Sequence, residues 1–524
     1  MMHLSLLRRI GNDSMRRNTS YQAITVIDLW KKVLQGVDPT TTSTEHEIIK
    51  DMASAAITLN KGRFQNLIPD VAVASFRRYY STLGLDEKSR LFDNLINVFG
   101  VDEKEVNKAI LYWQGVTNRR GTGTGTGTTT NTTEEAVLRA ADCVYQSSQP
   151  LYSRLWAPLA QQADGISFLV NLRADLLDCI ATAPAGAGHL RSMSENLRRA
   201  LAGWFSVGLL SLERISWEHS TAAVLEQIAA EERVHSIAGG WEELKQRLDP
   251  ANRRVFAWTH PSLPGEPLVA LHVALCQEEL PQSMDAILKS SSTLSHATAT
   301  TSGGGGAVTD PRIEEAPRVK TRPTSACFYS ISTMKKGLAG VDLGNNLIKR
   351  AVKELSTELP SLKTMGTLSP LPGFASWLHV MIKQNKKNGA LLLRQEEEEN
   401  VLSKSGEASF SSLLRTLADV GFSETSEDVV ALLQPILLRL AAQYLLQEKH
   451  REKAFDPVAN FHLRNGASVY RLNWGADTSA SGMSRSFGIM VNYLYDMDKV
   501  EENNRRYLET GEISVSDSAK ALLL

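Results

Sequence analysis

Residues 327–350 read Cys327-Phe-Tyr-Ser-Ile-Ser-Thr-Met-Lys-Lys-Gly-Leu-Ala-Gly-Val-Asp-Leu-Gly-Asn-Asn-Leu-Ile-Lys-Arg350. The first part, up to Thr333, is rich in aromatic and β-branched residues, as a buried strand is. Three glycines then interrupt the pattern, and after them apolar residues recur from Leu347 to Leu355 at helical spacing. The segment is therefore predicted to form a strand, a glycine-containing turn and an amphipathic helix.

A helix that begins directly after a tight turn offers unpaired backbone N–H groups and the positive end of its dipole, which together bind phosphate well. Such a site in residues 327–350 would suit a pyrophosphate such as that of coenzyme A. The spacing Gly340-Val-Asp-Leu-Gly344 matches neither Gly-x-Gly-x-x-Gly nor the Gly-x-x-x-x-Gly-Lys-Ser/Thr loop. On the residues alone, an ordinary connection between a strand and a helix is the alternative.

The composition sets broad limits. A chain of 524 residues is long enough for about two or three domains, and its formal net charge of −1 does not favour a nucleic-acid partner. The four cysteines are far apart with no Cys-x-x-Cys pair, which argues against a disulfide scaffold or a zinc ribbon and favours a reducing compartment. No His/Cys/Asp cluster has metal-ligand spacing, so no metal site is predicted. No apolar run approaches the length of a membrane span, and we expect a soluble intracellular protein without stable membrane insertion.

The N-terminal residues 1–20 are a candidate mitochondrial leader. They carry four arginines against one aspartate, with Leu4, Leu6, Leu7 and Ile10 as an apolar side, and a basic, acid-poor, amphipathic segment is typical of transit peptides. A disordered basic tail is the alternative. The chain ends Ala519-Lys-Ala-Leu-Leu-Leu524 rather than Ser-Lys-Leu, so a peroxisomal address is not predicted.

Residues 21–214 are predicted to form a helical bundle. Helices are expected over 136–144, with Thr133 as the N-cap, over 166–180, and over 193–210 with a continuation to Ile215. The Gly-Thr repeat at 121–133 is predicted to be a flexible loop between helices.

Residues 215–500 are predicted to form a mixed α/β domain, and 501–524 a C-terminal tail. Strands are expected at 254–260, 267–275 and 469–474, and they are too scattered along the chain for a doubly wound sheet. A glycine-rich excursion is expected at 290–306, and the glutamate run 396–399 is predicted to be solvated. The predicted fold class is α+β, with a helical bundle before the mixed domain.

Several blocks, in order along nearly the whole chain, resemble the malonyl-CoA decarboxylase family. They are Phe168-Leu-Val-Asn-Leu-Arg-Ala-Asp-Leu-Leu177, Gly203-Trp-Phe-Ser-Val-Gly208, Phe328-Tyr-Ser-Ile-Ser332, Gly337-Leu-Ala-Gly-Val-Asp-Leu-Gly344, Leu368-Ser-Pro-Leu-Pro-Gly-Phe374, Asn460-Phe-His-Leu-Arg-Asn-Gly466 and Arg471-Leu-Asn-Trp-Gly-Ala-Asp477. The resemblance implies an N-terminal helical domain used in self-association, with a tetramer as the expected oligomer. It also implies a catalytic domain with the GNAT acetyltransferase fold.

The activity implied by the resemblance is decarboxylation of malonyl-CoA to acetyl-CoA and carbon dioxide, which regulates malonyl-CoA levels in fatty-acid metabolism. Loss of carbon dioxide leaves an enolate, so the enzyme must stabilise an oxyanion and deliver a proton to carbon. Because the thioester is itself the electron sink, no cofactor is expected beyond the coenzyme A of the substrate.

The resemblance places the catalytic serine and histidine at Ser369 and His462, and a further tyrosine of this network at Tyr495. His462 would protonate the enolate with a pKa near neutrality, and Ser369 would bind the malonyl carboxylate or position His462. From the residues alone Ser369 fits a turn serine and Tyr495 a core aromatic. Four other histidines are equally visible, namely His260, His272, His379 and His450.

The resemblance also assigns Ala339 through Asn345 to the pyrophosphate loop of coenzyme A; the residues are Ala339, Gly340, Val341, Asp342, Leu343, Gly344 and Asn345. A carboxylate would repel phosphate, so Asp342 is expected to turn away and either cap the helix or bond to a neighbour.

The alternative functions are a GNAT-type acyl-CoA transferase and a non-catalytic acyl-CoA-binding protein. The expected location is the mitochondrial matrix, with the cytoplasm as the alternative.

Overall fold

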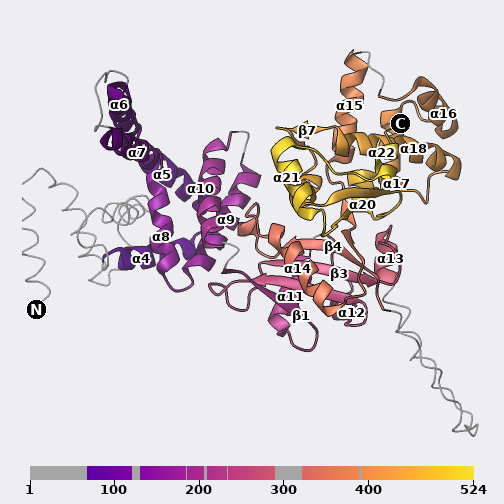
Figure 1. Cartoon of the computed structure of the whole chain (residues 1–524), viewed down its shortest axis with the longest axis horizontal. Coiled ribbons are helices and arrows are strands. Elements are labelled where there is room, and N and C mark those ends of the chain that lie inside the picture. The colour runs from indigo at the N-terminus through magenta and orange to yellow at the C-terminus, as the bar shows by residue number, and fades with distance from the viewer. Residues whose placement is uncertain are drawn as a thin grey trace, which may run out of the picture. The chain divides into compact units, whose positions relative to one another are not determined.

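The computed structural model describes residues 68–120, 130–183, 186–205, 209–232, 234–289, 322–388 and 392–523. The chain divides into two compact units (Figure 1): one comprises residues 1–206 and 335–341, and the other comprises residues 207–334 and 342–524. The expected leader, the insert at 290–306 and most of the Gly-Thr repeat lie outside the described residues.

The first unit is helical. Its interior includes one side of α9 (Gly165–Thr182), where Leu169, Leu172 and Leu176 are fully buried at the spacing of a helix face. The helix predicted over 166–180 is therefore confirmed. The other elements are α4 (Ile68–Thr82), α5 (Leu85–Phe99), α6 (Glu103–Arg120), α7 (Thr130–Ser147), η2 (Leu151–Leu155), α8 (Trp156–Gln161) and α10 (Gly188–Trp204).

Two predicted helix boundaries in this part of the chain were wrong. Helix α7 begins at Thr130, so Thr133 lies inside the helix and is not its N-cap. The helix expected over 193–210 ends at Trp204, and Ser211–Ile215 form strand β1 instead of a helical continuation. The helical segment predicted to reach residue 214 is thus shorter, and its last residues belong to the sheet of the second unit.

The second unit is built on one eight-stranded sheet with the order β1-β2-β3-β4-β5-β10-β6, and β9 also pairs with β10. The strands are β1 (Ser211–Ile215), β2 (Arg253–Thr259), β3 (Val269–Cys276), β4 (Ser325–Thr333), β5 (Thr364–Thr367), β6 (Ser369–Pro370), β9 (Ser468–Asn473) and β10 (Met490–Leu494). Within this sheet β4 and β5 are parallel, and the crossover between them contains α14 (Gly344–Glu358). The strand and the helix predicted from residues 327–350 are therefore confirmed, as is the mixed α/β class.

Helices cover both faces of the strands β2 and β3. Leu225 of α11 (Ala222–Glu231) and Leu244 of α12 (Gly240–Arg247) share a core cluster with Val255 and Ala257 of β2. Trp258, whose side chain points to the opposite face, donates a hydrogen bond from its indole N–H to the carbonyl oxygen of Leu343 at the start of α14. Because both faces are buried, these strands read as continuous apolar runs and not as alternating ones.

The rest of the second unit contains α13 (Met284–Lys289), α15 (Phe374–Asn388), α16 (Gln395–Ser405), α17 (Phe410–Val420), α18 (Glu427–Leu446), α19 (Pro457–Arg464), α20 (Ala480–Ser486) and a small hairpin of β7 (Lys449–His450) with β8 (Lys453–Ala454). Contrary to the sequence-based expectation, α18 is long and apolar enough to cross a membrane by length and composition. Its side chains Leu433, Leu437 and Leu440 are fully buried within the protein, as in a core helix of a globular domain.

The C-terminal segment is not a loose tail. Residues after Tyr495 form α21 (Val500–Thr510) and α22 (Asp517–Ala521). Tyr507 is buried, accepts the N–H of Ala454 on its hydroxyl and donates to Asn460. The prediction of a separate tail at 501–524 was therefore wrong, because this segment packs against α19 and β9.

Candidate active site

Ser369 lies at the beginning of the short strand β6, the last strand in the order of the sheet. It follows β5 by two residues and pairs with Val491 of β10. Pro370 disfavours the helical conformation for the residue before it, which explains why Ser369 is extended. The side chain is buried, with 6% of the residue exposed.

His462 lies on α19, two residues before that helix ends. The helix begins because Asp456 caps it by accepting the N–H groups of Val458 and Ala459, both at 2.9 Å, while Pro457 occupies the first turn. His462 is 3% exposed and faces the interior.

Tyr495 comes directly after β10 and is held by a main-chain hydrogen bond from its N–H to the carbonyl oxygen of Met365. Its ring packs against Phe328 of β4, with 6.2 Å between the ring centroids. Tyr495 is therefore the core aromatic that the sequence allowed, but its hydroxyl points to His462.

The structure brings the three predicted side chains together in one hydrogen-bonded chain. Ser369 Oγ lies 3.0 Å from His462 Nε2, and Tyr495 Oη lies 2.9 Å from His462 Nδ1. These residues come from β6, α19 and the end of β10, so the fold and not proximity in sequence assembles them.

The number of available protons fixes the direction of this chain. Ser369 Oγ donates its single proton to Thr367 Oγ1, at 2.9 Å. The contact between Ser369 and His462 must then be a donation from Nε2–H to Oγ. Because a neutral imidazole carries one N–H, Nδ1 accepts from the Tyr495 hydroxyl. The arrangement differs from that of a serine nucleophile, whose hydroxyl would donate to the histidine.

Burial lowers the pKa of His462 to about 3. The expectation of a pKa near neutrality was therefore wrong for the protein without substrate, because a fully enclosed imidazole loses the hydration that stabilises its charged form. Burial also raises the pKa of Tyr495, so its hydroxyl stays protonated. The site at rest is neutral, with the imidazole proton on the nitrogen that faces Ser369.

Sequence reasoning missed two residues that contact the site. Thr367 accepts the Ser369 proton, and Tyr493 stacks on the His462 ring with 4.6 Å between centroids and 25° between planes. Both are two residues away from a predicted site residue in an extended segment. Strand alternation, which puts residues i and i+2 on the same side, was the signal that could have found them.

The glycine loop before α14 contains the predicted pyrophosphate residues. Gly340 has a positive φ of 75°, which a residue with a side chain rarely adopts. A Cβ atom on Gly344 would lie 2.9 Å from the Phe461 ring, so only glycine lets α14 begin this close to α19. Asp342 pairs with Arg464 at 3.3 Å, which confirms that its carboxylate bonds to a neighbour. Asn345 lies in the first turn of α14.

In the helical unit, buried Arg173 of α9 holds the preceding part of this loop. One of its guanidinium nitrogens donates to the carbonyl oxygens of Gly337, at 2.5 Å, and Ala339, at 2.8 Å. A Cβ atom on Gly337 would lie 1.8 Å from the carbonyl oxygen of Val170, so the loop packs directly against the backbone of α9. Arg198 of α10 also donates to the carbonyl oxygen of Gly340, at 3.1 Å, so two arginines and one close backbone contact hold the main chain of the loop.

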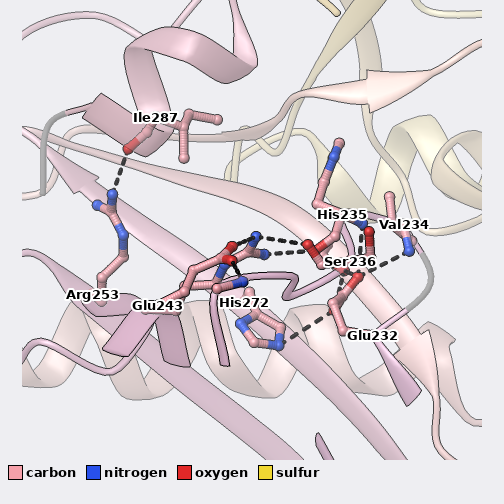
Figure 2. Close-up of polar contacts among 11 residues, drawn as sticks. Glu232, Val234, His235, Ser236, Glu243, Arg253, His272 and Ile287 are labelled. Carbon is pink, nitrogen blue, oxygen red and sulfur yellow. Dashed lines mark hydrogen bonds and ion pairs between the residues drawn. The ribbon is translucent and has the colours of Figure 1, made fainter. Parts of the chain in front are cut away.

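A second group of buried polar side chains surrounds Glu232, where α11 ends against β3 and β4 (Figure 2). Its carboxylate accepts the Ser330 hydroxyl at 2.8 Å and the N–H groups of Val234 and His235 at 2.9 and 3.0 Å. Burial opposes ionisation of Glu232, but the hydrogen bonds from these donors hold its pKa below the usual value. Burial lowers the pKa of His272 to about 4, so this histidine is neutral although it lies 3.4 Å from Glu232. The Glu232 carboxylate is thus satisfied by groups of the protein itself and joins three elements.

Comparisons with family models match both parts of the chain. Residues 99–205 match the model of the malonyl-CoA decarboxylase N-terminal domain, and residues 208–524 match that of the malonyl-CoA decarboxylase C-terminal domain. The division between the two matched regions lies close to the division between the helical unit and the sheet unit.

Proteins that are similar to most of the chain are also malonyl-CoA decarboxylases. The chain is 38% identical over 449 residues to the mitochondrial malonyl-CoA decarboxylase of Anser anser anser, covering 85% of this chain and 81% of that protein. It is 37% identical over 453 residues to the mitochondrial malonyl-CoA decarboxylase of Mus musculus, covering 86% of this chain and 85% of that protein.

Solved structures agree. The crystal structure of malonyl-CoA decarboxylase from Rhodopseudomonas palustris matches with a TM-score of 0.69 and 30% identity, covering 92% of this chain and 100% of that one. The crystal structure of malonyl-CoA decarboxylase from Agrobacterium vitis matches with a TM-score of 0.68 and 30% identity, covering 91% of this chain and 99% of that one.

Proposed function

Because this chain belongs to the malonyl-CoA decarboxylase family, we propose that Ser369, His462 and Tyr495 form the site at which it converts malonyl-CoA to acetyl-CoA and carbon dioxide. The observation that carries the proposal is a pair of hydrogen bonds, 3.0 and 2.9 Å long, that joins the three side chains in the interior of the second unit, which we call the catalytic unit.

The reaction requires a proton donor and a stabiliser of negative charge. Breaking the bond between the carboxylate carbon and the α-carbon releases carbon dioxide, and the electron pair moves into the thioester carbonyl to form an enolate. Re-formation of the carbonyl then returns the pair to the α-carbon, which takes a proton. We propose that the imidazole of His462 gives that proton from Nε2, the nitrogen that carries a proton at rest.

His462 has to gain a proton before it can act as an acid of useful strength. Its pKa of about 3 applies to the protein without substrate. A malonyl carboxylate next to a buried imidazole favours the charged imidazole and raises its pKa. Substrate binding would thus add a proton from solvent to His462 and form an imidazolium. The imidazolium becomes neutral again when it gives its Nε2 proton to the α-carbon.

The other two residues hold this imidazole and the acyl group. Ser369 Oγ accepts Nε2–H at rest and is the hydroxyl closest to the donor nitrogen, so it can instead bond to the malonyl carboxylate or to the enolate oxygen once the substrate is present. Tyr495 supplies no proton, because burial raises its pKa. Its hydroxyl donates to Nδ1 of the neutral ring and accepts Nδ1–H of the charged ring, so it keeps the ring in place in both states.

Residues 339–345 would bind the pyrophosphate of coenzyme A through their main-chain N–H groups at the start of α14. Two observations within the catalytic unit support this role: Asp342 is turned toward Arg464, and Gly344 lies against Phe461, whose ring neighbours that of His462 at 5.0 Å between centroids. The start of α14 and the proposed proton donor are therefore adjacent.

We further propose, from the family resemblance, that the protein forms homo-oligomers, with a tetramer as the expected state, and that its catalytic domain has the GNAT fold. The curated relatives are named mitochondrial, which supports the matrix as its location. No cofactor is needed, since the thioester accepts the electrons itself.

The test is an assay of the purified protein with malonyl-CoA and no acceptor amine. We expect stoichiometric acetyl-CoA and carbon dioxide. Turnover that appears only when an amine is added would favour an acyltransferase, and binding without turnover would favour an acyl-CoA-binding protein.

A further inference from the structure

Thr367 occupies a fixed position at the end of β5, two residues before Ser369, and is fully buried. Its Oγ1 accepts two hydrogen bonds, from the Ser369 hydroxyl at 2.9 Å and from the main-chain N–H of Tyr493 at 3.2 Å. Its carbonyl oxygen accepts the side-chain amide of Asn492 at 2.7 Å. Both the main chain and the side chain of Thr367 are thus anchored to β10.

We propose that Thr367 is a positioning residue that sets which nitrogen of His462 carries the proton. This proposal rests on the proposed role of His462 as the proton donor. Ser369 has one proton, and two acceptors lie within reach of it: Thr367 Oγ1 at 2.9 Å and His462 Nε2 at 3.0 Å. As long as the proton goes to Thr367, Nε2 must be the donor in its contact with Ser369.

Removing the threonine oxygen would reverse the direction of the hydrogen bonds between Ser369, His462 and Tyr495. The Ser369 proton would then turn to His462 Nε2, and the imidazole proton would move to Nδ1 and donate to Tyr495. In that state the Nε2 lone pair holds the Ser369 hydroxyl, so the proton that His462 takes up with the substrate can enter at Nε2 only after this hydrogen bond breaks. The other tautomer would also make Ser369 resemble a serine activated as a nucleophile, which decarboxylation does not use.

The test compares Thr367→Val, which is nearly the same shape but has no hydroxyl, with Thr367→Ser, which keeps the hydroxyl and loses a methyl group. The first readout is nitrogen NMR of isotope-labelled histidine in the substrate-free protein, with the His462 signals assigned from a His462→Asn spectrum. We expect the protonated nitrogen to be Nε2 in the wild type and in Thr367→Ser, and Nδ1 in Thr367→Val.

The second readout is kinetic. Thr367→Val should lower kcat by on the order of 100-fold, because the Ser369 hydroxyl then blocks protonation of His462 at Nε2, the nitrogen from which the general acid donates, while the Kd for acetyl-CoA stays within about twofold. Thr367→Ser should retain most of the wild-type kcat. The matched control is Thr364→Val, which makes the same chemical change at the other, partly exposed end of β5 and should move neither readout.

Two outcomes would overturn the proposal: an unchanged Nε2–H signal in folded Thr367→Val, or a loss of activity in Thr367→Ser as large as that in Thr367→Val, which would point to packing. Both are distinguishable from a failure of the proposed function. If His462 is not the proton donor, Thr367→Val still switches the tautomer but leaves kcat unchanged. Thermal unfolding of each variant shows that it is folded.

Discussion

Replacing His462 by alanine is expected to lower kcat for malonyl-CoA decarboxylation by about 100- to 10,000-fold, the range that a positioned general acid contributes. The Kd for coenzyme A should change little, because the proposed pyrophosphate contacts come from main-chain N–H groups at the start of α14 and not from the His462 side chain. Acetyl-CoA formation under saturating substrate gives kcat, and titration with acetyl-CoA gives the affinity.

The matched control for this variant is His450→Ala, which removes an exposed imidazole from the small hairpin β7–β8 and should have no effect on kcat. A His462→Ala protein with full activity would refute the assignment of the proton donor. A joint loss of kcat and of thermal stability would instead indicate that removal of this buried side chain disturbs the fold.

Replacing Ser369 by alanine is expected to lower kcat by roughly 100- to 1,000-fold, the usual cost of losing one well-placed donor to a developing oxyanion. The change removes the acceptor of the His462 Nε2–H and the hydroxyl that we propose bonds to the malonyl group. Initial rates measured over a range of malonyl-CoA concentrations separate an effect on kcat from one on KM.

Ser484→Ala is a suitable control, because that serine lies on the exposed side of α20 and its hydroxyl bonds within its own helix. If Ser369→Ala raised KM alone, Ser369 would serve to bind the ground state and not the transition state. Activity at the wild-type level would remove Ser369 from the site altogether.

The order of the elements around residues 327–350 could be predicted because the local pattern and the tertiary structure agree there. The aromatic strand, the glycines and the helix each have a local signature, and all are found as β4, the loop and α14. Strand β1 had no such signature. Its five residues Ser211–Ile215 are largely exposed apart from Ile215, and a short, charged edge strand is not distinguishable from the end of a helix by periodicity.

The choice among the histidines could not be made from the sequence by physical reasoning. His272 and His462 are both buried, and burial lowers the pKa of each, to about 4 and about 3. What separates them is their neighbours: His272 lies beside a carboxylate that the protein already satisfies, and His462 bonds to Ser369 and Tyr495. Those contacts join residues 93 and 33 positions apart in the chain, so the choice of His462 rested on the family resemblance.

The pKa of His462 was wrongly predicted for a related reason. A reference value near neutrality describes an imidazole in water, and no local pattern indicates that α19 buries this ring between Tyr493 and Tyr495. The lower pKa changes the mechanism, because His462 then has to be protonated when the substrate binds.

In the proposed mechanism His462 protonates the malonyl α-carbon. A crystal structure with a malonyl-CoA analogue that cannot lose carbon dioxide would show where this carbon lies. We expect the α-carbon about 3–3.5 Å from His462 Nε2, the separation of a near-attack geometry. An α-carbon more than twice as far from Nε2, with the hydrogen bond between His462 and Ser369 intact, would contradict the account.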